Sequence, residues 1–408
     1  MKSNYNLKRL SLLIAVPSTY VFLFSFPEYW HFVLGHVHIP NLYPFLDMKG
    51  RLAHIQGHQI GLDIYNMPNP LDPAGRINDK PSYTLMLSYL GLNLQHAVPL
   101  SVFFIILMVF GILLLVKPRN WWQMVAAYLA ICSPSVLLAA ERGNDDIVIF
   151  GFLLIVPIFL SRNNLLSDLV AFCIISIVSP VKYYPFVTYI LFAHRDRKNR
   201  QILFWLTSSI ASVTIFILIT YREILFLSSR LPQPEYMHSF GAKLIFDFLG
   251  LKFPISQLLT FFIIFFIVIS VKFFSLHKRI VLPKIYKIEE YYFLLGSSVI
   301  SFCFFLNSNY DYRLIFCLFL LPALYSWLEK SQLSFYLRFL FTLSIILILV
   351  IMWIPYIYYF FERIVFDLSF LSKTILVFRM TLTWLLIIII TILSFLLLHL
   401  FPIRCTQI

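Results

Sequence analysis

Residues 123–160 read "QMVAAYLAICSPSVLLAAERGNDDIVIFGFLLIVPIFL", and this stretch decides the fold. Two apolar runs flank residues 141–146, where five of the six side chains are charged or carry an amide. Apolar runs of this kind recur along nearly the whole chain, as a hydrocarbon layer about 30 Å thick requires of helices that cross it. The pattern therefore predicts a polytopic membrane protein in which short polar segments join the helices.

The composition of the whole chain supports the same class. Its 408 residues are 60% hydrophobic and only 12% charged, whereas a soluble domain carries roughly a quarter charged residues. The apolar runs are continuous rather than alternating, which excludes a membrane β-barrel. We predict an all-α transmembrane helical bundle that forms one domain over residues 1–408. Segment 1–26 has a basic start and an apolar stretch without a small-residue cleavage site, so we interpret it as an uncleaved first span.

The apolar segments predict about twelve spans. The sixth is short for a span, and we expect it to be tilted or broken. The chain has no obvious internal repeat and no low-complexity linker. The predicted spans are Leu10–Phe26, Ala97–Val116, Gln123–Ala140, Ile147–Leu160, Leu165–Val181, Tyr183–Phe192, Gln201–Tyr221, Ile255–Leu276, Tyr291–Leu306, Leu314–Leu328, Phe339–Tyr356 and Val377–Phe401.

The distribution of basic residues predicts the orientation of these spans. With both termini in the cytoplasm, the inner segments, such as "HRDRKNR" at residues 194–200, hold most of the basic excess. The formal net charge of +13 is then explained by topology and by attraction to anionic lipids, not by nucleic-acid binding. The outer face receives the long first loop, 27–96, together with residues 141–146, Lys182 and the segment Asn307–Arg313.

The first outer loop predicts a cap of surface helices over the bundle. After Asp47, apolar residues recur at helical spacing and predict an amphipathic helix on the membrane. "NMPNPLDPAG" at residues 66–75 predicts tight turns, and "SYTLMLSYLGL" at residues 82–92 predicts a second helix. Asp47 has two interpretations: an N-cap of the first helix, or a general base that takes a proton from a hydroxyl group.

The histidines and cysteines do not predict a metal site. His54 and His58 have the i, i+4 spacing of a shared metal site, and His36 and His38 precede them, but no HExxH or CxxC motif joins them. We expect interfacial or substrate-contacting histidines. The cysteines are expected to be small apolar packing residues.

The charged segment 141–146 also has two interpretations. In the first, Arg142 simply pairs with Glu141 or Asp145, and the remaining groups are solvated. In the second, Arg142, Lys182 and Arg313 bind one anionic ligand, because all three lie at outer helix ends, and a phosphate at the membrane surface suits them. The residues that we expect to shape this site are Glu141, Asn144, Asp145 and Asp311.

Four segments resemble a known family. "FLDMKGRLAHIQGHQIGLDIYNMPNPLDPAGR" (45–76), "ERGNDDIVIFGFLL" (141–154), "VKYYPF" (181–186) and "NYDYRLIF" (309–316) resemble bacterial membrane glycosyltransferases of the GT-C superfamily, nearest to glycosyltransferase family 87. The resemblance covers roughly residues 1–330. It implies a GT-C-like fold in a bacterial plasma membrane and inverting transfer of a sugar from a polyprenyl-phosphate donor. The family's catalytic aspartate corresponds to Asp47. No Asp-Asp or Glu-Asp pair follows the first span, which argues against a metal-dependent scheme.

The implied chemistry fits the candidate residues. Breaking a sugar–phosphate bond requires a base near the acceptor hydroxyl and cations at the departing phosphate. No nucleotide-binding loop is present, and no cofactor is expected. The expected partners are the lipid-linked donor, a glycan or glycolipid acceptor and membrane lipids. The alternatives are an outer-face glycan ligase or polymerase, a lipid-linked sugar transporter or flippase, and a non-catalytic scaffold.

Overall fold

The computed structural model describes residues 2–34, 43–77, 81–228, 239–250, 282–306, 309–362 and 369–398. Helices occupy most of these residues, which confirms the all-α prediction. The elements of the first half are α1 (Lys2–Ser25), η1 (Pro27–Tyr29), α2 (Trp30–Leu34), α3 (Leu46–Gln59), α4 (Pro81–Ser88), η4 (Leu94–His96), α5 (Ala97–Leu115), α6 (Trp121–Ile131), α7 (Pro134–Arg142), α8 (Asp145–Leu153) and α9 (Val156–Ser161).

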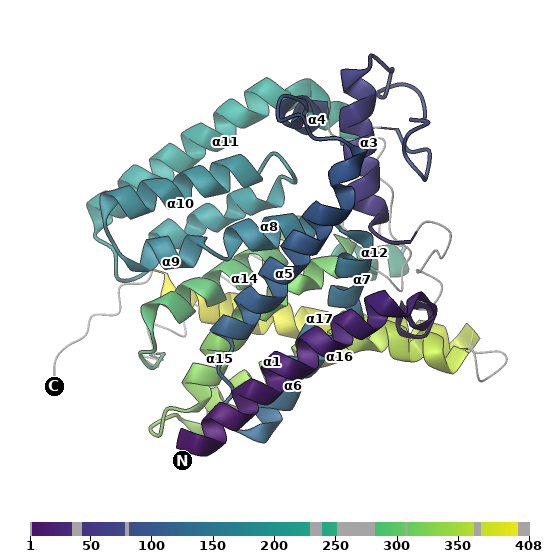
Figure 1. Cartoon of the computed structure of the whole chain (residues 1–408). Coiled ribbons are helices and arrows are strands. Elements are labelled where there is room, and N and C mark those ends of the chain that lie inside the picture. The colour runs from purple at the N-terminus through teal and green to yellow at the C-terminus, as the bar shows by residue number, and fades with distance from the viewer. Residues whose placement is uncertain are drawn as a thin grey trace.

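The second half continues the bundle. Figure 1 shows α3 and α4 at one end of it, and α15 with the N-terminus at the other. We call these the α3 end and the far end. The remaining elements are α10 (Leu165–Val178), η5 (Tyr184–Ala193), α11 (Asn199–Ser228), β1 (Ser239–Phe240), α12 (Lys243–Phe248), α14 (Lys287–Leu306), β2 (Asn309–Tyr310), η7 (Asp311–Leu320), α15 (Leu321–Leu328), α16 (Phe335–Glu362) and α17 (Ser369–Leu397).

Eight helices among the described residues are long and apolar enough to cross a membrane, as an integral membrane protein requires. Two further apolar helices are shorter, and one of them is the predicted sixth span, which forms the ten-residue 3₁₀ helix η5. The eight are Leu7–Ser25, Leu94–Leu115, Trp121–Arg142, Asn199–Glu223, Lys287–Phe305, Asp311–Leu328, Phe335–Ile354 and Lys373–Leu397.

Three predicted spans are interrupted, and one of them is Leu314–Leu328, which changes from η7 to α15 at residues 320–321. The segment Gln123–Ala140 changes from α6 to α7 at residues 132–133, and Ile147–Leu160 changes from α8 to α9 at residues 154–155. Pro134 and Pro157 lie in the first turns of the second helices. Proline is accepted there because its missing N–H would have no helical partner, whereas it breaks a helix interior. The predicted span Ile255–Leu276 lies outside the described residues.

The core of the bundle surrounds α14. This helix packs against η5, η7, α9 and α17, and Tyr291, Phe293 and Leu295 on it are fully buried. The neighbouring α8 packs against η7, where the rings of Phe150 and Phe319 stack with their centroids 4.2 Å apart. Aromatic rings therefore fill the centre of the bundle between the two ends.

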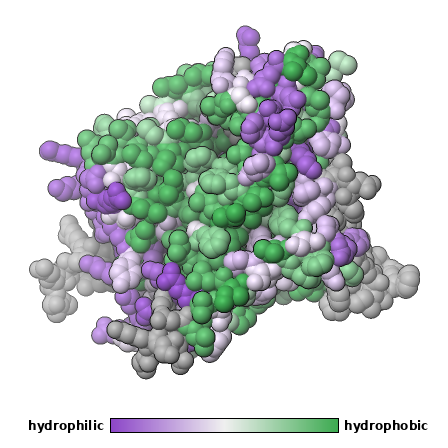
Figure 2. All heavy atoms as spheres, in the orientation of Figure 1, coloured by the Kyte–Doolittle hydropathy of each residue, from purple (hydrophilic) through white to green (hydrophobic). Residues whose placement is uncertain are grey.

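At the periphery of the bundle, apolar side chains are exposed rather than buried. Only 11% of the apolar window of α11 is buried, and Leu203, Ile210 and Leu218 on it are exposed. Figure 2 shows a broad apolar surface on the face in view, with hydrophilic residues gathered around α3. An apolar surface of this kind suits hydrocarbon rather than water.

A buried ion pair joins α10 to the start of α11 at the far end. Arg197 donates to both Asp168 oxygens, at 2.6 and 2.8 Å, and to the hydroxyl of Tyr291, at 3.0 Å. Both charged side chains are almost completely buried. Because neither group reaches water, each depends on the other for its stability.

We predict that Asp168→Asn lowers the free energy of unfolding by about 3–5 kcal/mol, because it leaves the Arg197 charge buried without its counterion. The measurement is thermal or denaturant unfolding of the purified protein in detergent. Asp247→Asn is the matched control, since it removes a partly exposed i, i+4 pair with Lys243, which is worth about 0–1 kcal/mol. Equal losses for the two variants would contradict the assignment.

Candidate functional site

The segment 141–146 forms the turn between α7 and α8 at the α3 end. Gly143 ends α7 in the left-handed conformation, with φ +58°. A Cβ atom there would lie 2.6 Å from the Ser101 hydroxyl oxygen, so both the conformation and the space require glycine. Asn144 then caps α8, because its side-chain oxygen accepts the N–H of Asp146 at 3.0 Å. The turn thus directs consecutive polar side chains into the bundle.

Asp146 is the most buried acid of this turn, with no exposed surface. One carboxylate oxygen accepts Lys182 Nζ at 2.6 Å and the Tyr184 hydroxyl at 2.6 Å. The other oxygen lies 3.9 Å from Arg313 Nε and has no hydrogen-bond donor. Asp146 therefore holds two of the predicted phosphate-binding cations, which come from the start of η5 and from η7.

Asp47 lies beside this group and is not an N-cap. The N-cap of α3 is Phe45, and Asp47 is the second residue of the helix. Its carboxylate accepts Asn144 Nδ2 at 2.6 Å and Arg76 Nη1 at 3.0 Å, while Arg142 Nη1 lies 4.0 Å away. The N-cap interpretation is wrong because side chains from distant segments bind this carboxylate instead of the helix backbone.

Asn144 connects Asp47 to the cations. Its amide nitrogen donates to Asp47, and its oxygen accepts Lys182 Nζ at 2.9 Å. The amide side chain of Asn144 thus fixes the distance between the Asp47 carboxylate and the Lys182 ammonium group. The contacts join Asp47, Asn144, Lys182 and Asp146 into one group, which we call the Asp146 cluster together with Arg142, Tyr184 and Arg313.

The remaining charges of the turn surround this cluster. Glu141 is buried, and its carboxylate lies 4.0 Å from Arg142 Nε, as the first interpretation of the turn expected. That interpretation is wrong about the remaining groups, because Asn144, Asp145 and Asp146 are buried rather than solvated. Asp145 instead pairs with Arg51 Nη2 of α3, at 3.1 Å. The backbone carbonyl of Glu141 also accepts the N–H of Phe45 at 2.8 Å. These contacts dock the start of α3 against the α7–α8 turn.

Aromatic rings contact two cations of the cluster, Lys182 and Arg313. Lys182 Nζ lies 5.1 Å from the ring centre of Tyr312, and the Arg313 guanidinium lies 5.4 Å from that of Tyr184. A cation beside an aromatic face gains electrostatic stabilisation when water is scarce. Arg313 Nε has no hydrogen-bond acceptor, and about a quarter of its side chain is exposed. Part of the Arg313 side chain therefore remains accessible, whereas its Nε atom is buried 3.9 Å from Asp146 Oδ2.

Asp311 lies apart from the Asp146 cluster. This buried carboxylate accepts a hydrogen bond from Arg379 Nη2 of α17, and Arg379 Nη1 donates to the Ser239 carbonyl at 2.9 Å. Ser239 pairs with Tyr310 in the short β1–β2 ladder. Asp311 thus anchors the start of η7 to α17. Because Arg313 follows two residues later, this contact helps to position Arg313.

The loop after α3 supports Asp47 through Arg76. The Arg76 guanidinium bridges Asp72 and Asp47, with Nε 2.8 Å from Asp72 Oδ2 and Nη1 3.0 Å from Asp47 Oδ1. A Cβ atom on Gly50 would lie 1.8 Å from Arg76 Nη2, so α3 needs glycine where this guanidinium crosses it. Asn69 Nδ2 and His54 Nδ1 lie 3.2 Å apart and join the same loop to α3.

The contact with Arg76 also determines the protonation state of the Asp72 carboxylate. Burial alone raises the pKa of Asp72, but the hydrogen bonds and charge of Arg76 and two backbone N–H groups outweigh it. The pKa of Asp72 therefore lies below its ordinary value. The charged carboxylate is the form that fixes Arg76 beside Asp47.

The histidines of the first loop do not gather at one point. His54 is buried between Asn69 and Asp72, whereas the His58 ring packs near Tyr65; His36 and His38 lie outside the described residues. Among the residues that the structure describes, one group of three side chains has metal-ligand spacing, namely His194, Asp196 and Glu290. It follows η5 and includes no predicted site residue.

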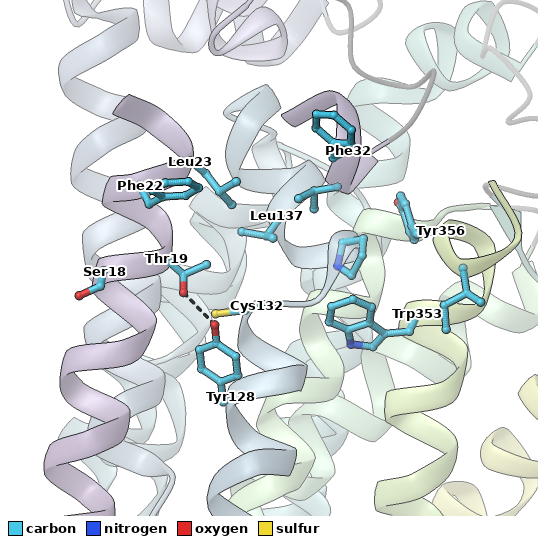
Figure 3. A pocket seen from close by; sticks show the side chains of 13 residues that line it. Ser18, Thr19, Phe22, Leu23, Phe32, Tyr128, Cys132, Leu137, Trp353 and Tyr356 are labelled. Carbon is cyan, nitrogen blue, oxygen red and sulfur yellow. Dashed lines mark hydrogen bonds between the residues drawn. The ribbon is translucent and has the colours of Figure 1, made fainter. Parts of the chain in front are cut away.

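An apolar groove of about 760 Å³ lies between α1, α2, α6, α7 and α16. Figure 3 shows residues of α1 on one side of it and those of α16 on the other. Leu137 of α7 lines it and precedes Arg142 by five residues, which is about 7.5 Å along a helix. The lining residues are Ser18, Thr19, Phe22, Leu23, Phe32, Val33, Tyr128, Cys132, Pro134, Leu137, Trp353, Tyr356 and Ile357.

Three contributors to the site were not predicted from the sequence. Asp146 stands next to Asp145, and Tyr184 next to Tyr183. Neighbouring side chains on a helix point about 100° apart. The residue at which the helix begins therefore decides which member of an adjacent pair faces the interior. Arg76 carried one available signal: it ends a turn-rich segment that returns the chain toward α3.

The chain was compared with protein-family models, with curated proteins and with solved structures, and none of them matches it. The resemblance to glycosyltransferases therefore rests on the four sequence segments.

We predict that Asp72→Asn lowers the free energy of unfolding by about 1–3 kcal/mol at pH 7, because a charge-assisted pair with Arg76 is lost. A carboxylate whose folded-state pKa is depressed stabilises the fold above its ordinary pKa and loses that effect as the pH falls through the folded value. The difference between the wild type and the variant should therefore begin to shrink below about pH 4 and continue to shrink toward the folded-state pKa of Asp72. The measurement is thermal unfolding in detergent from pH 7 to pH 3.

Asp63→Asn is the control for this prediction. Asp63 is exposed in the same loop and accepts hydrogen bonds from residues 65 and 66. Its substitution should change stability by less than about 1 kcal/mol. A difference between Asp72→Asn and the wild type that persists unchanged at pH 3 would contradict the assignment.

Proposed function

We propose that this protein is a membrane glycosyltransferase with a GT-C-like bundle of about twelve spans. It transfers a sugar, with inversion, from a polyprenyl-phosphate donor to a hydroxyl group of a glycan or glycolipid at the outer face of a bacterial plasma membrane. Both termini are cytoplasmic in this proposal. The observation that carries it is the position of one partly exposed carboxylate, Asp47, which lies 4.0 Å from Arg142 and is linked to Lys182 through Asn144. Arg313 lies beside Asp146 in the same cluster.

The cations of the cluster provide the phosphate site. Three positive side chains, from α7, from the link before η5 and from η7, each keep some exposure to solvent. Arginine and lysine bind phosphate oxygens through charge-assisted hydrogen bonds. As the sugar–phosphate bond breaks, charge grows on the departing phosphate, so preorganised cations lower the barrier. Asp146 keeps Lys182 and Arg313 in place without occupying their outer surfaces.

Asp47 provides the base. Its side chain is 19% exposed, and a carboxylate has about four acceptor positions, of which Asn144 and Arg76 use two. An acceptor hydroxyl can therefore still reach it and transfer a proton during attack on the sugar. Asn144 fixes this base relative to Lys182, which is the geometric requirement for attack and departure on opposite sides of one sugar.

The apolar groove suits the lipid part of the donor. It lies below the cluster along α7, and aromatic and aliphatic side chains form most of its wall. A polyprenyl chain gains free energy when its apolar surface leaves water. With the chain in this groove, the phosphate would reach Arg142 within about two helical turns of Leu137.

A transporter or flippase is less well supported. Transport needs a polar path between the two ends, whereas stacked rings such as Phe150 and Phe319 fill the described centre of the bundle. An outer-face ligase or polymerase would use the same cations but would transfer a whole glycan chain. Product size in the assay below distinguishes this alternative.

We predict that Asp47→Asn lowers turnover about 10²- to 10⁴-fold, the usual scale for loss of a general base. The assay follows a radiolabelled sugar from a panel of polyprenyl-phosphate donors to an acceptor extract, with purified protein. Binding of polyprenyl phosphate should stay within a few-fold of wild type, because Asp47 does not hold the phosphate. Arg142→Met should instead weaken donor binding.

Asp63→Asn is the matched control, because it changes an exposed acid of the same loop. Sugar transfer by Asp47→Asn at the wild-type rate would remove Asp47 from the mechanism. Movement of the lipid-linked sugar across reconstituted vesicles, without transfer to any acceptor, would favour the transporter instead.

A further inference from the structure

A second cavity, which is polar and has a volume of about 400 Å³, lies at the far end of the bundle. The link between α5 and α6, the start of α14 and the end of α15 enclose it. It is separate from the Asp146 cluster, because the cavity lies at the far end of the bundle and the cluster lies at the α3 end. The lining residues are Arg119, Lys284, Ile285, Tyr286, Glu289, Ser326, Glu329 and Lys330.

In two carboxylates of this cavity one oxygen each lacks a donor, although the Glu289 carboxylate also accepts hydrogen bonds from the Ser326 side chain and the Tyr286 backbone N–H. Glu289 is 92% buried, and its Oε2 atom has no hydrogen-bond partner. Glu329 accepts Arg119 Nε at 2.8 Å on Oε2, but its Oε1 atom is also buried without a partner. A carboxylate oxygen can accept about two hydrogen bonds, so these two oxygens could both accept from one donor group that binds in the cavity.

The charge of the cavity narrows the identity of that donor. Arg119, Lys284 and Lys330 provide positive charge around the two carboxylates, and Lys284 and Lys330 are exposed at the opening. These cations repel a free metal ion and attract a phosphate. Burial, opposed by Arg119 and Lys330 and assisted by Glu289, raises the pKa of Glu329 to about 7. A ligand with an ammonium group would favour the charged form of this carboxylate.

The surroundings of the cavity indicate a membrane surface. Large aromatic side chains are exposed near it at the start of α6, before α14 and at the start of α16. Tryptophan and tyrosine gather at the membrane–water interface, where lipid headgroups lie. The exposed residues are Trp121, Trp122, Tyr286, Phe335 and Tyr336.

We propose that this cavity binds the headgroup of phosphatidylethanolamine. The primary ammonium donates to the free oxygens of Glu289 and Glu329, and the phosphate lies between Lys284 and Lys330. A choline headgroup cannot replace it, because a quaternary ammonium has no N–H donor. The proposal does not depend on the function assigned to the α3 end.

The test uses the full-length protein, purified and depleted of lipid in detergent. Thermal unfolding is followed while dihexanoyl phosphatidylethanolamine, phosphatidylcholine, free phosphoethanolamine or inorganic phosphate is added. We expect a saturable rise in Tm with phosphatidylethanolamine, at an apparent Kd at least about tenfold lower than that of the other three. Equal affinity for the choline lipid, for phosphoethanolamine or for phosphate would overturn the proposal.

Two variants test the assigned residues. Glu289→Gln with Glu329→Gln should remove the preference for phosphatidylethanolamine over phosphatidylcholine, raising the Kd for the former about 10- to 100-fold. Lys284→Met with Lys330→Met should weaken both lipids alike. The control is Asp196→Asn, a half-exposed acid outside the cavity, and it should keep the preference. If the double glutamine variant also keeps it, the proposal is wrong.

Discussion

The carboxylate of Asp146 lies inside the bundle, and the α3 end of the molecule is organised around its charge. A buried carboxylate is tolerated only when cations and hydrogen-bond donors surround it. Lys182 and Tyr184 supply two donors, and Arg313 approaches the second oxygen from η7. Segments that are 36 or more residues apart in the sequence must therefore meet at one point.

The burial of Asp146 also determines the position of Asp47. Asn144, which caps the helix that Asp146 begins, also donates to Asp47, so the acid on α3 is positioned by the same turn. Arg76 binds Asp47 from the other side and is itself fixed by Asp72. The first loop and the α7–α8 turn thus form one polar unit above an apolar groove. The lipid-linked substrate that we propose would need this combination, because its tail requires an apolar surface and its phosphate requires cations.

The sequence predicted the class of the fold and most of the polar residues that meet at the α3 end. Apolar runs of membrane-spanning length predicted the helices, and the helix after Asp47 is present as α3. Prolines 134 and 157 break two predicted spans, and their position at helix starts depends on the packing of neighbouring helices. The sequence could not identify Asp146 rather than Asp145, because the choice depends on the first turn of α8. Nor could it separate Asp311 from the cluster, since the Arg379 that binds it lies 68 residues away.

The central claim is that Asp146 and Lys182 act as one charge-balanced pair on which the site depends. A double-mutant cycle on the free energy of unfolding tests it most directly, with Asp146→Asn, Lys182→Met and both together in detergent. Each single variant leaves a buried charge or donor without its partner, whereas the double variant removes both. The account predicts a coupling energy of about 1.5–3 kcal/mol. Additive losses, with a coupling energy below about 0.5 kcal/mol, would contradict it.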